Sequence, residues 1–198
     1  MNVKDLIRKR LNKSFAIISL VCSIGLVICG ISLFAISSQY HNALTNYGFA
    51  QGDIGKAMTT FSETRSALRA VIGYDDESEI NSEKKNYETK KKAFEGFMQD
   101  IESKMMTKAG KEAYQQAESA LNGYWTKADA ILQQGSTTDK IASSAAQHKE
   151  IDELGPMYDE IYASLKNIMD IKVAEGNSVQ GTLNVVKYIL IILSLIHI

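Results

Sequence analysis

Proline is almost absent from this chain, because Pro156 is the only one among 198 residues. The sequence also lacks the alternation of apolar and polar residues that indicates half-buried strands. Helix-favouring residues such as Ala, Lys, Glu, Met and Leu are common instead. These features together predict an all-α protein.

Residues for catalysis and metal binding are equally scarce. The two cysteines, Cys22 and Cys29, lie seven residues apart in one apolar stretch, and we interpret them as small apolar side chains in a membrane helix. None of the three histidines completes the Glu-x-x-His pair of a di-iron bundle, and the chain has no Gly-rich phosphate loop or nucleophile motif. The net charge of −1 does not suggest a nucleic-acid partner. We therefore expect that the protein is not an enzyme and that it binds no metal, cofactor or nucleic acid.

A long uncharged segment near the N-terminus predicts a membrane anchor. Residues 15–37, "FAIISLVCSIGLVICGISLFAIS", have the length of a full transmembrane helix. Residues 1–14 carry five basic residues against one acid, Asp5, and such basic flanks stay in the cytoplasm. A cleaved signal peptide is the alternative, but its apolar core is usually about 7–15 residues long. We therefore expect a cytoplasmic stub, a first span, and an extracytoplasmic region that begins at residue 38.

A second apolar run closes the sequence. Lys187 and Tyr188 are suited to a membrane interface, and an apolar stretch follows them. That stretch is about half the length of a span, which takes roughly 20 residues. We expect residues 184–198 to be the start of a second transmembrane helix that is truncated here.

The region between the spans, residues 38–183, is acidic, with a net charge of about −6. Turn signals at 73–79, 105–110 and 133–139 divide it into four helical pieces, with Gly73 as a C-terminal cap and Asp76 and Thr107 as N-caps. Short turns imply antiparallel neighbours. The sequence thus predicts an up-down-up-down four-helix bundle whose first and last helices continue into the spans.

Each piece has core candidates at alternating spacings of three and four residues. These are Tyr40, Leu44, Tyr47, Gln51, Ile54, Met58, Phe61, Arg65, Leu68 and Ile72 in the first piece; Ile80, Tyr87, Phe94, Met98, Ile101 and Met105 in the second; Ala113, Ala117, Leu121, Tyr124, Ala128 and Ile131 in the third; and Leu154, Tyr158, Ile161, Leu165, Ile168, Lys172 and Val179 in the fourth.

Arg65 is out of place on this apolar seam, and Arg69 follows it one helical turn later. A buried arginine is costly unless it is paired. Two interpretations stay open. One is structural: the side chain extends along the helix to solvent, or it forms a salt bridge to an acid of a neighbouring helix, such as Asp159 or Glu160. The other is a site for an anion or carboxylate, which the planar guanidinium group binds with two parallel hydrogen bonds.

The order of these segments, together with "TRSALRAVI" (residues 64–72), resembles the sensor half of bacterial methyl-accepting chemotaxis proteins. The resemblance implies a homodimer in the cytoplasmic (inner) membrane that senses a small ligand, or a ligand-loaded binding protein, and signals to cytoplasmic modules. It also implies that Arg65 and Arg69 hold the carboxylate of a ligand across the dimer interface. Pro156 and Met157 stand where the amino-acid receptors of this family have a Pro-Thr pair, and Thr60 stands where they have a third arginine.

Two other functions fit the same sequence. The sensor module could serve a histidine kinase or a nucleotide cyclase. Alternatively, the chain could be a membrane-anchored helical spacer that binds no small molecule. Ligand-induced thermal stabilisation would distinguish a sensor from a spacer.

Overall fold

The computed structural model describes residues 3–196, and within that range the backbone forms helices and turns without a strand. The chain divides into two compact units. One is Thr45–Gly176, and the other combines Met1–Leu44 with Asn177–Ile198. The prediction of an all-α four-helix bundle is confirmed.

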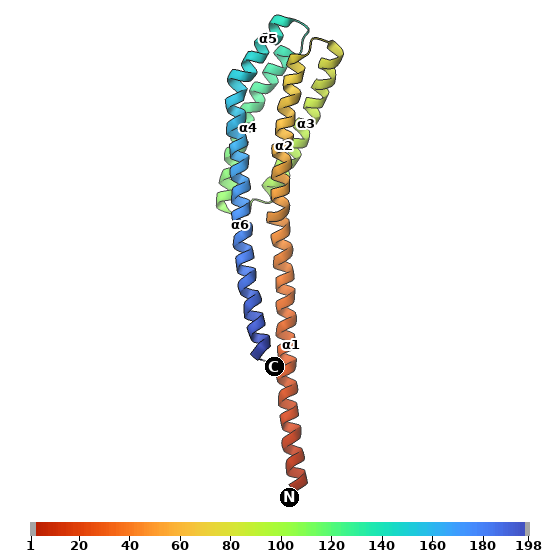
Figure 1. The fold of residues 1–198 in the computed structure, drawn as a ribbon, viewed down its shortest axis with the longest axis vertical. Helices are drawn as coiled ribbons and strands as arrows, with labels where there is room; N and C mark the ends of the chain where they lie inside the picture. Colours follow the sequence, from red (N-terminus) through yellow and green to blue (C-terminus); the bar gives the residue numbers. More distant parts are fainter. Residues whose placement is uncertain (1–2, 197–198) are drawn as a thin grey trace. The chain divides into compact units, whose positions relative to one another are not determined.

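The first unit contains the bundle (Figure 1). Its helices are α2 (Phe49–Gly73), α3 (Glu77–Ser103), α4 (Lys108–Gly135) and a fourth helix that consists of α5 (Lys140–Lys149), the π-helical turn η2 (Glu150–Leu154) and the beginning of α6 (Gly155–Ile196). Another π-helical turn, η1 (Leu44–Gly48), precedes α2. The turns between successive helices are short, so neighbours run antiparallel as predicted.

The helix starts follow the sequence signals. Asp76 accepts hydrogen bonds from the backbone N–H groups of Ser78 and Glu79 at 2.9 and 3.1 Å, and Thr107 accepts one from Gly110 at 3.1 Å. The predicted glycine cap after α2 is wrong. Gly73 is the last helical residue, and no glycine in the described part of the chain has the positive φ of such a cap.

The core confirms most of the predicted seam. All predicted positions in α3 and α4, and the adjoining Met105, are buried, as are Leu154, Ile161, Leu165, Ile168 and Lys172 in the fourth helix. In α2 six of the ten buried residues lie at heptad spacing, with larger and smaller side chains in alternation. These six are Ile54, Ala57, Phe61, Thr64, Leu68 and Val71. The predicted seam positions Tyr40 and Leu44 are exposed.

Phe61 is the centre of an aromatic cluster between the helices. Its ring centroid lies 5.3 Å from Phe94 of α3, 5.0 Å from Tyr124 and 5.8 Å from Trp125 of α4, and 5.1 Å from Tyr158 of α6. Aromatic pairs at these separations add about 0.5–1.5 kcal/mol each beyond their buried area. One side chain therefore ties all four helices together.

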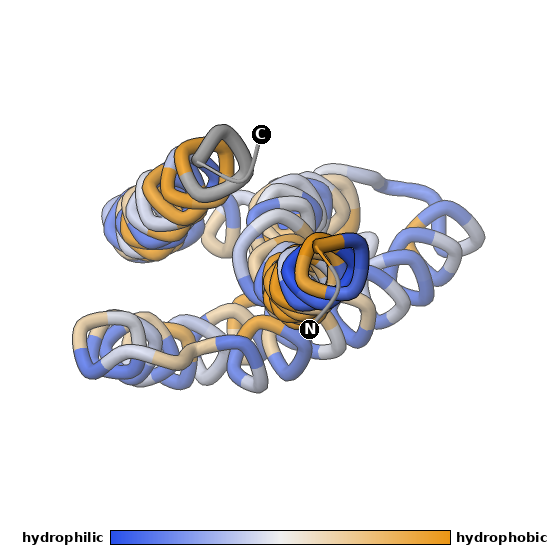
Figure 2. Tube along the Cα trace, turned by 90° about the horizontal axis from the view of Figure 1, so that it is seen from below, coloured by the Kyte–Doolittle hydropathy of each residue, from blue (hydrophilic) through white to orange (hydrophobic). Residues whose placement is uncertain are grey.

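The second unit holds α1 (Val3–Ala43), which has no buried residue. Together with its continuation to Gly73, α1 is the one described helix that is long and apolar enough to cross a membrane. Its most apolar window, near the N-terminus, has a mean hydropathy of 2.6. Figure 2 shows the charged N-terminal turns in blue and the apolar stretch in orange. An apolar helix with no protein cover suggests membrane association. Residues 184–196 are helical, and the end of the predicted second span lies outside the described residues.

Candidate functional site

The two arginines predicted as site residues hold one buried carboxylate. Arg65 Nε donates a hydrogen bond to Glu150 Oε1 at 2.7 Å, and Arg69 Nε lies 2.9 Å from Glu150 Oε2. The Glu150 side chain is 2% exposed, that of Arg65 is 14% exposed and that of Arg69 is 52% exposed. Two cations against one anion leave the cluster with a net charge of +1, so Glu150 is neutralised from both sides.

Arg65 is fixed by packing as well as by charge. Its guanidinium carbon lies 4.4 Å from the ring centroid of Tyr158, which is within the range of a cation–π contact. The Tyr158 hydroxyl shares a hydrogen bond of 2.5 Å with the Ser62 hydroxyl, so the ring cannot turn away from α2. Burial raises the pKa of the nearby Tyr124 hydroxyl, and the charge of Arg65 opposes this rise.

Glu150 reaches the arginines because of its place on the fourth helix. The buried positions Ser143, Ala146, Glu150 and Leu154 continue the apolar seam backwards along the chain. In η2 the N–H of Gly155 bonds to the carbonyl of Glu150, five residues earlier. Pro156 follows directly, and a proline inside a helix removes one backbone donor and crowds the preceding turn. A π-turn just before a proline relieves this conflict.

Side chains from the same part of the fourth helix form hydrogen bonds with the backbone at the C-terminal end of α2. Ser143 Oγ and Gln147 Nε2 both donate to the backbone carbonyl of Ile72, at 2.5 and 2.8 Å. These bonds serve a helix-end carbonyl that has no partner within α2, and they explain why no glycine cap is needed there.

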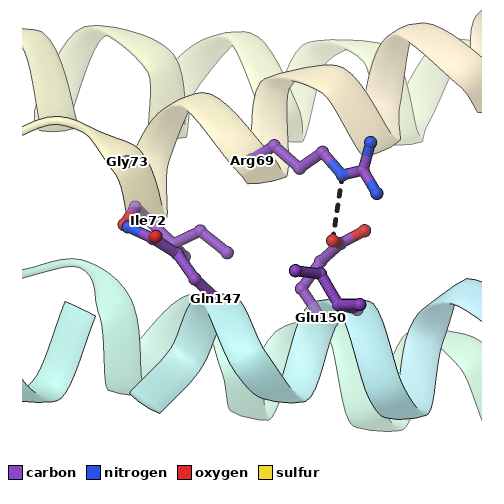
Figure 3. Close-up of a pocket in the computed structure, with 6 residues that line it drawn as sticks. Arg69, Ile72, Gly73, Gln147 and Glu150 are labelled. Atoms are coloured by element: carbon purple, nitrogen blue, oxygen red, sulfur yellow. Dashed lines mark hydrogen bonds and ion pairs between the residues drawn. The ribbon is translucent and has the colours of Figure 1, made fainter. Parts of the chain in front are cut away.

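An open cleft of about 470 Å³ lies beside the cluster. Its walls are Arg69, Ile72 and Gly73 of α2 and Gln147, Glu150 and Ile151 of the fourth helix. Figure 3 shows Arg69 reaching across it to Glu150. Because Arg69 is half-exposed, part of its guanidinium group stays accessible to a solute in the cleft.

The predicted site residues are only partly brought together. Arg65 and Arg69 share Glu150, and Arg69 lines the cleft. Pro156 is exposed and Met157 packs against the core, and neither lines the cleft.

The salt-bridge interpretation holds for both arginines, but with Glu150 in place of the suggested Asp159 or Glu160. Thr60 is buried and its carbonyl accepts the Thr64 hydroxyl at 2.7 Å. Sequence reasoning missed Glu150, Ser143 and Gln147, although their spacing before Leu154 could have indicated them. No group of three or more His, Cys, Asp or Glu residues within the described part could hold a metal ion.

A family model described as "Four helix bundle sensory module for signal transduction" matches residues 4–184. This match covers both arginines, Glu150 and nearly all of the described chain, and it agrees with the resemblance to the sensor region of methyl-accepting chemotaxis proteins. None of the curated proteins matches the sequence.

Proposed function

The chain belongs to the family of four-helix-bundle sensory modules for signal transduction, and from this premise we propose that it is the sensing region of a transmembrane chemoreceptor in the cytoplasmic (inner) membrane. Five basic residues before the apolar part of α1 support an N-terminus inside the cell. The bundle then lies outside, and the fourth helix leads back toward the membrane.

The proposed ligand is a small carboxylate or a similar anion at the cleft beside Arg69. The observation that carries this proposal is that Arg65 and Arg69 already bind one carboxylate, that of Glu150. Their arrangement suits this chemistry, and the net positive charge of the cluster leaves it able to attract an anion from solvent. The half-exposed Arg69 offers the first contact.

Signalling follows from competition with Glu150. An anion that takes over Arg69 weakens one of the two ion pairs joining α2 to the fourth helix. The bundle then favours a second packing, and a small shift of the fourth helix passes toward the membrane. The ligand drives this change only by as much as it prefers the second packing.

The proposed sensor works as a homodimer through α2. Positions Gly52, Thr59, Ser66 and Gly73 recur every seven residues and are all exposed. Small residues at heptad spacing let a second α2 approach closely. Confinement in a membrane raises the effective concentration of two anchored chains, so a weak interface is sufficient.

The experiment is a thermal-shift screen of the full chain in lipid nanodiscs against mono- and dicarboxylates and phosphate, at matched ionic strength. We expect at least one small anion to raise the unfolding temperature. Arg69→Ala should weaken the affinity for that anion by roughly tenfold, so that a higher anion concentration is needed for the same shift. Arg69→Lys, which keeps the charge and loses the planar fork, should also weaken it. Lys166→Ala, an exposed cation elsewhere on α6, is the matched control. Stabilisation that persists in the Arg65→Ala, Arg69→Ala double variant would contradict this site.

A further inference from the structure

Two neighbouring residues of the turn η2 lie in the opposite environments from those that their side chains favour. The carboxylate Glu150 is 2% exposed, whereas the next residue, Ile151, is 61% exposed. Burying an isoleucine is favourable, and burying a carboxylate is costly unless it is paired. Ile151 also lines the cleft, together with Arg69 and Ile72. An apolar side chain therefore lies one residue away from the buried charge, at the edge of the same cleft.

The core register of the fourth helix changes by one residue at η2. After the turn, the core positions Tyr158 and Leu165 are seven residues apart. Counting back by seven from Tyr158 reaches Ile151 and not Glu150. Before the turn, the buried residues Ser143 and Glu150 are also seven residues apart. A π-helical turn contains one residue more than the α-helical path, so η2 joins these two registers.

A shift of the extra residue towards the N-terminus would exchange the two side chains. The π-turn would then lie between Ala146 and Ile151 instead of between Glu150 and Leu154. Ala146 and Leu154 are both buried, and both would keep their places in the core. Ile151 would take the place that Glu150 has now, and the carboxylate would turn away from the arginines. This shifted register changes only about two turns of one helix.

Arg65 contacts both ends of the turn and holds it in its present register. Its Nε donates to Glu150 at 2.7 Å, and a Cβ on Gly155, directly after the turn, would lie 3.5 Å from its Nη2. Arg69 Nε lies 2.9 Å from the other Glu150 oxygen. The two arginines thus fix the register through a single carboxylate. An anion that binds the arginines in place of Glu150 removes this restraint.

Pro156 favours the present register as well. It directly follows η2 and Gly155, it is exposed, and it does not line the cleft. In a regular α-helix the proline ring crowds the carbonyl group four residues earlier, here that of Asp152, and the wider π-turn relieves this crowding. The burial of Ile151 favours the shifted register instead. Two registers with opposing contributions form a two-state element that a ligand can bias.

We propose that η2 is the conformational switch of the anion site: an anion on the two arginines releases Glu150, the π-turn shifts towards the N-terminus, and Ile151 packs into the core in its place. The ligand in this scheme rests on the proposed function, whereas the two registers are properties of the chain itself. Pro156 is then a positioning residue, which acts on the anion through Glu150 and not through a contact of its own.

Methyl NMR of the full chain in lipid nanodiscs measures the exchange directly. Isoleucine δ1 methyl groups are labelled, Ile151→Val assigns the signal, and a neutral gadolinium chelate in solution broadens the signals of exposed methyl groups. We expect the Ile151 signal to be broadened without ligand. It should be protected in Glu150→Gln, which removes the charge, and in the wild type with succinate or inorganic phosphate. Ile141 of α5, which is 82% exposed, is the control and should stay broadened in every sample.

Affinities for the same two anions give a second test. Pro156→Ala should raise the affinity by roughly threefold to tenfold, because the shifted register becomes more populated. A proline that only supported the fold would lower the affinity when it is removed. Ile151→Ser should lower the affinity by a similar factor and leave the unfolding temperature of the free protein nearly unchanged. Ile141→Ser replaces another exposed isoleucine and should leave the affinity unchanged.

The switch and the ligand fail in different ways. An Ile151 methyl group that stays as exposed in Glu150→Gln as in the wild type overturns the switch, whether or not an anion binds. Should Glu150→Gln not fold, Pro156→Ala gives the same readout, as partial protection. A lower anion affinity of Pro156→Ala also overturns the switch. If neither anion binds the wild type while Glu150→Gln protects Ile151, the switch is supported and only the proposed ligand is rejected.

Discussion

The ammonium group of Lys172 is completely buried and donates a hydrogen bond of 2.6 Å to the backbone carbonyl of Lys104. Lys104 is the C-cap residue directly after α3, so a side chain of the fourth helix closes the C-terminus of α3. Lys172 also pairs with Glu175 at 2.9 Å and lies 5.2 Å from the ring centroid of Tyr47 in η1. These contacts join three helices at the end of the bundle that is opposite to the Glu150 cluster.

Lys172→Ala should lower the free energy of unfolding by about 2–4 kcal/mol, because it leaves the Lys104 carbonyl and Glu175 without their buried partner. Lys166→Ala removes an exposed lysine six residues earlier on the same helix, and its effect should stay within about 0.5 kcal/mol. Urea unfolding of the two variants measures the difference. Equal effects would show that Lys172 makes no net contribution.

The Glu150 cluster should give a graded series of destabilisation. Glu150→Ala leaves the mostly buried Arg65 unpaired and should cost about 2–4 kcal/mol. Arg65→Ala should cost less, because Arg69 still pairs with Glu150. Arg69→Ala, at a half-exposed position, should cost about 1 kcal/mol or less. Chemical unfolding orders the three variants, and an Arg69 effect larger than that of Glu150 would contradict the geometry.

Two glycines of α4 should respond to alanine with opposite signs. A Cβ on Gly135 would lie 2.5 Å from Ile72 Cγ2 and 2.7 Å from Ala146 Cβ, so Gly135→Ala must push the helices apart at a cost of about 1–3 kcal/mol. A Cβ on Gly123 would meet only Met157 Cε at 3.5 Å, an ordinary contact. Gly123→Ala should therefore stabilise the helix by about 0.5–1 kcal/mol. Thermal unfolding of both variants tests the pair.

The ion pair between Asp53 and Lys104 should make the free energy of unfolding depend on pH in the acidic range. The hydrogen bond from Lys104 holds the pKa of the Asp53 carboxyl below its usual value of 3.8. The stabilisation is therefore present above about pH 4 and is lost as the pH falls through the lowered pKa. Asp53→Asn should cost on the order of 1 kcal/mol at neutral pH, and its deficit should shrink in acid. Urea unfolding from about pH 7 to about pH 2.5 measures this deficit. Asp100→Asn, at an exposed acid on α3, is the control, and its difference in stability from the wild type should not change with pH in this way.

Cysteine cross-linking tests the proposed dimer. In a chain with Cys22 and Cys29 replaced by serine, Thr59→Cys and Ser66→Cys should form disulfides between subunits in membranes, because both positions lie on the exposed face of α2. Lys111→Cys on α4 should not cross-link. The bundle removed from the membrane should cross-link less, since confinement no longer raises its effective concentration. Absence of cross-links along the whole of α2 would exclude this interface.

How much the sequence predicted depends on side-chain size and charge. The buried positions of α3 were all predicted, because residues such as Tyr87 and Phe94 are large and apolar. In α4 six of the ten buried positions were predicted, and the missed ones are Gly110, Tyr114, Leu132 and Gly135. In α2, six of the ten buried positions were missed, and most of these, such as Ala57 and Thr64, are small side chains that do not stand out in a sequence. Glu150 was missed for the opposite reason. A charged residue in a sequence suggests a solvent-exposed position. The burial of Glu150 depends instead on two arginines that lie 85 and 81 positions earlier in the chain.

Long-range partners of this kind are not encoded by local spacing. The anomaly of Arg65 on an apolar seam predicted that a carboxylate would be found, but it did not predict which one. The π-turn also has only an indirect sequence signal in Pro156, because helical periodicity alone does not distinguish η2 from a regular turn.

The turn η2 also bears on how the length of the chain can vary. A π-helical turn contains one residue more than the α-helical path between the same two ends. The fourth helix can therefore lose one exposed residue, such as Ile151 or Asp152, and return to α geometry with Ala146 and Ile161 still facing the core. The same deletion elsewhere in the helix would rotate every later side chain by about 100°. Single-residue insertions and deletions among related chains should therefore gather at this turn.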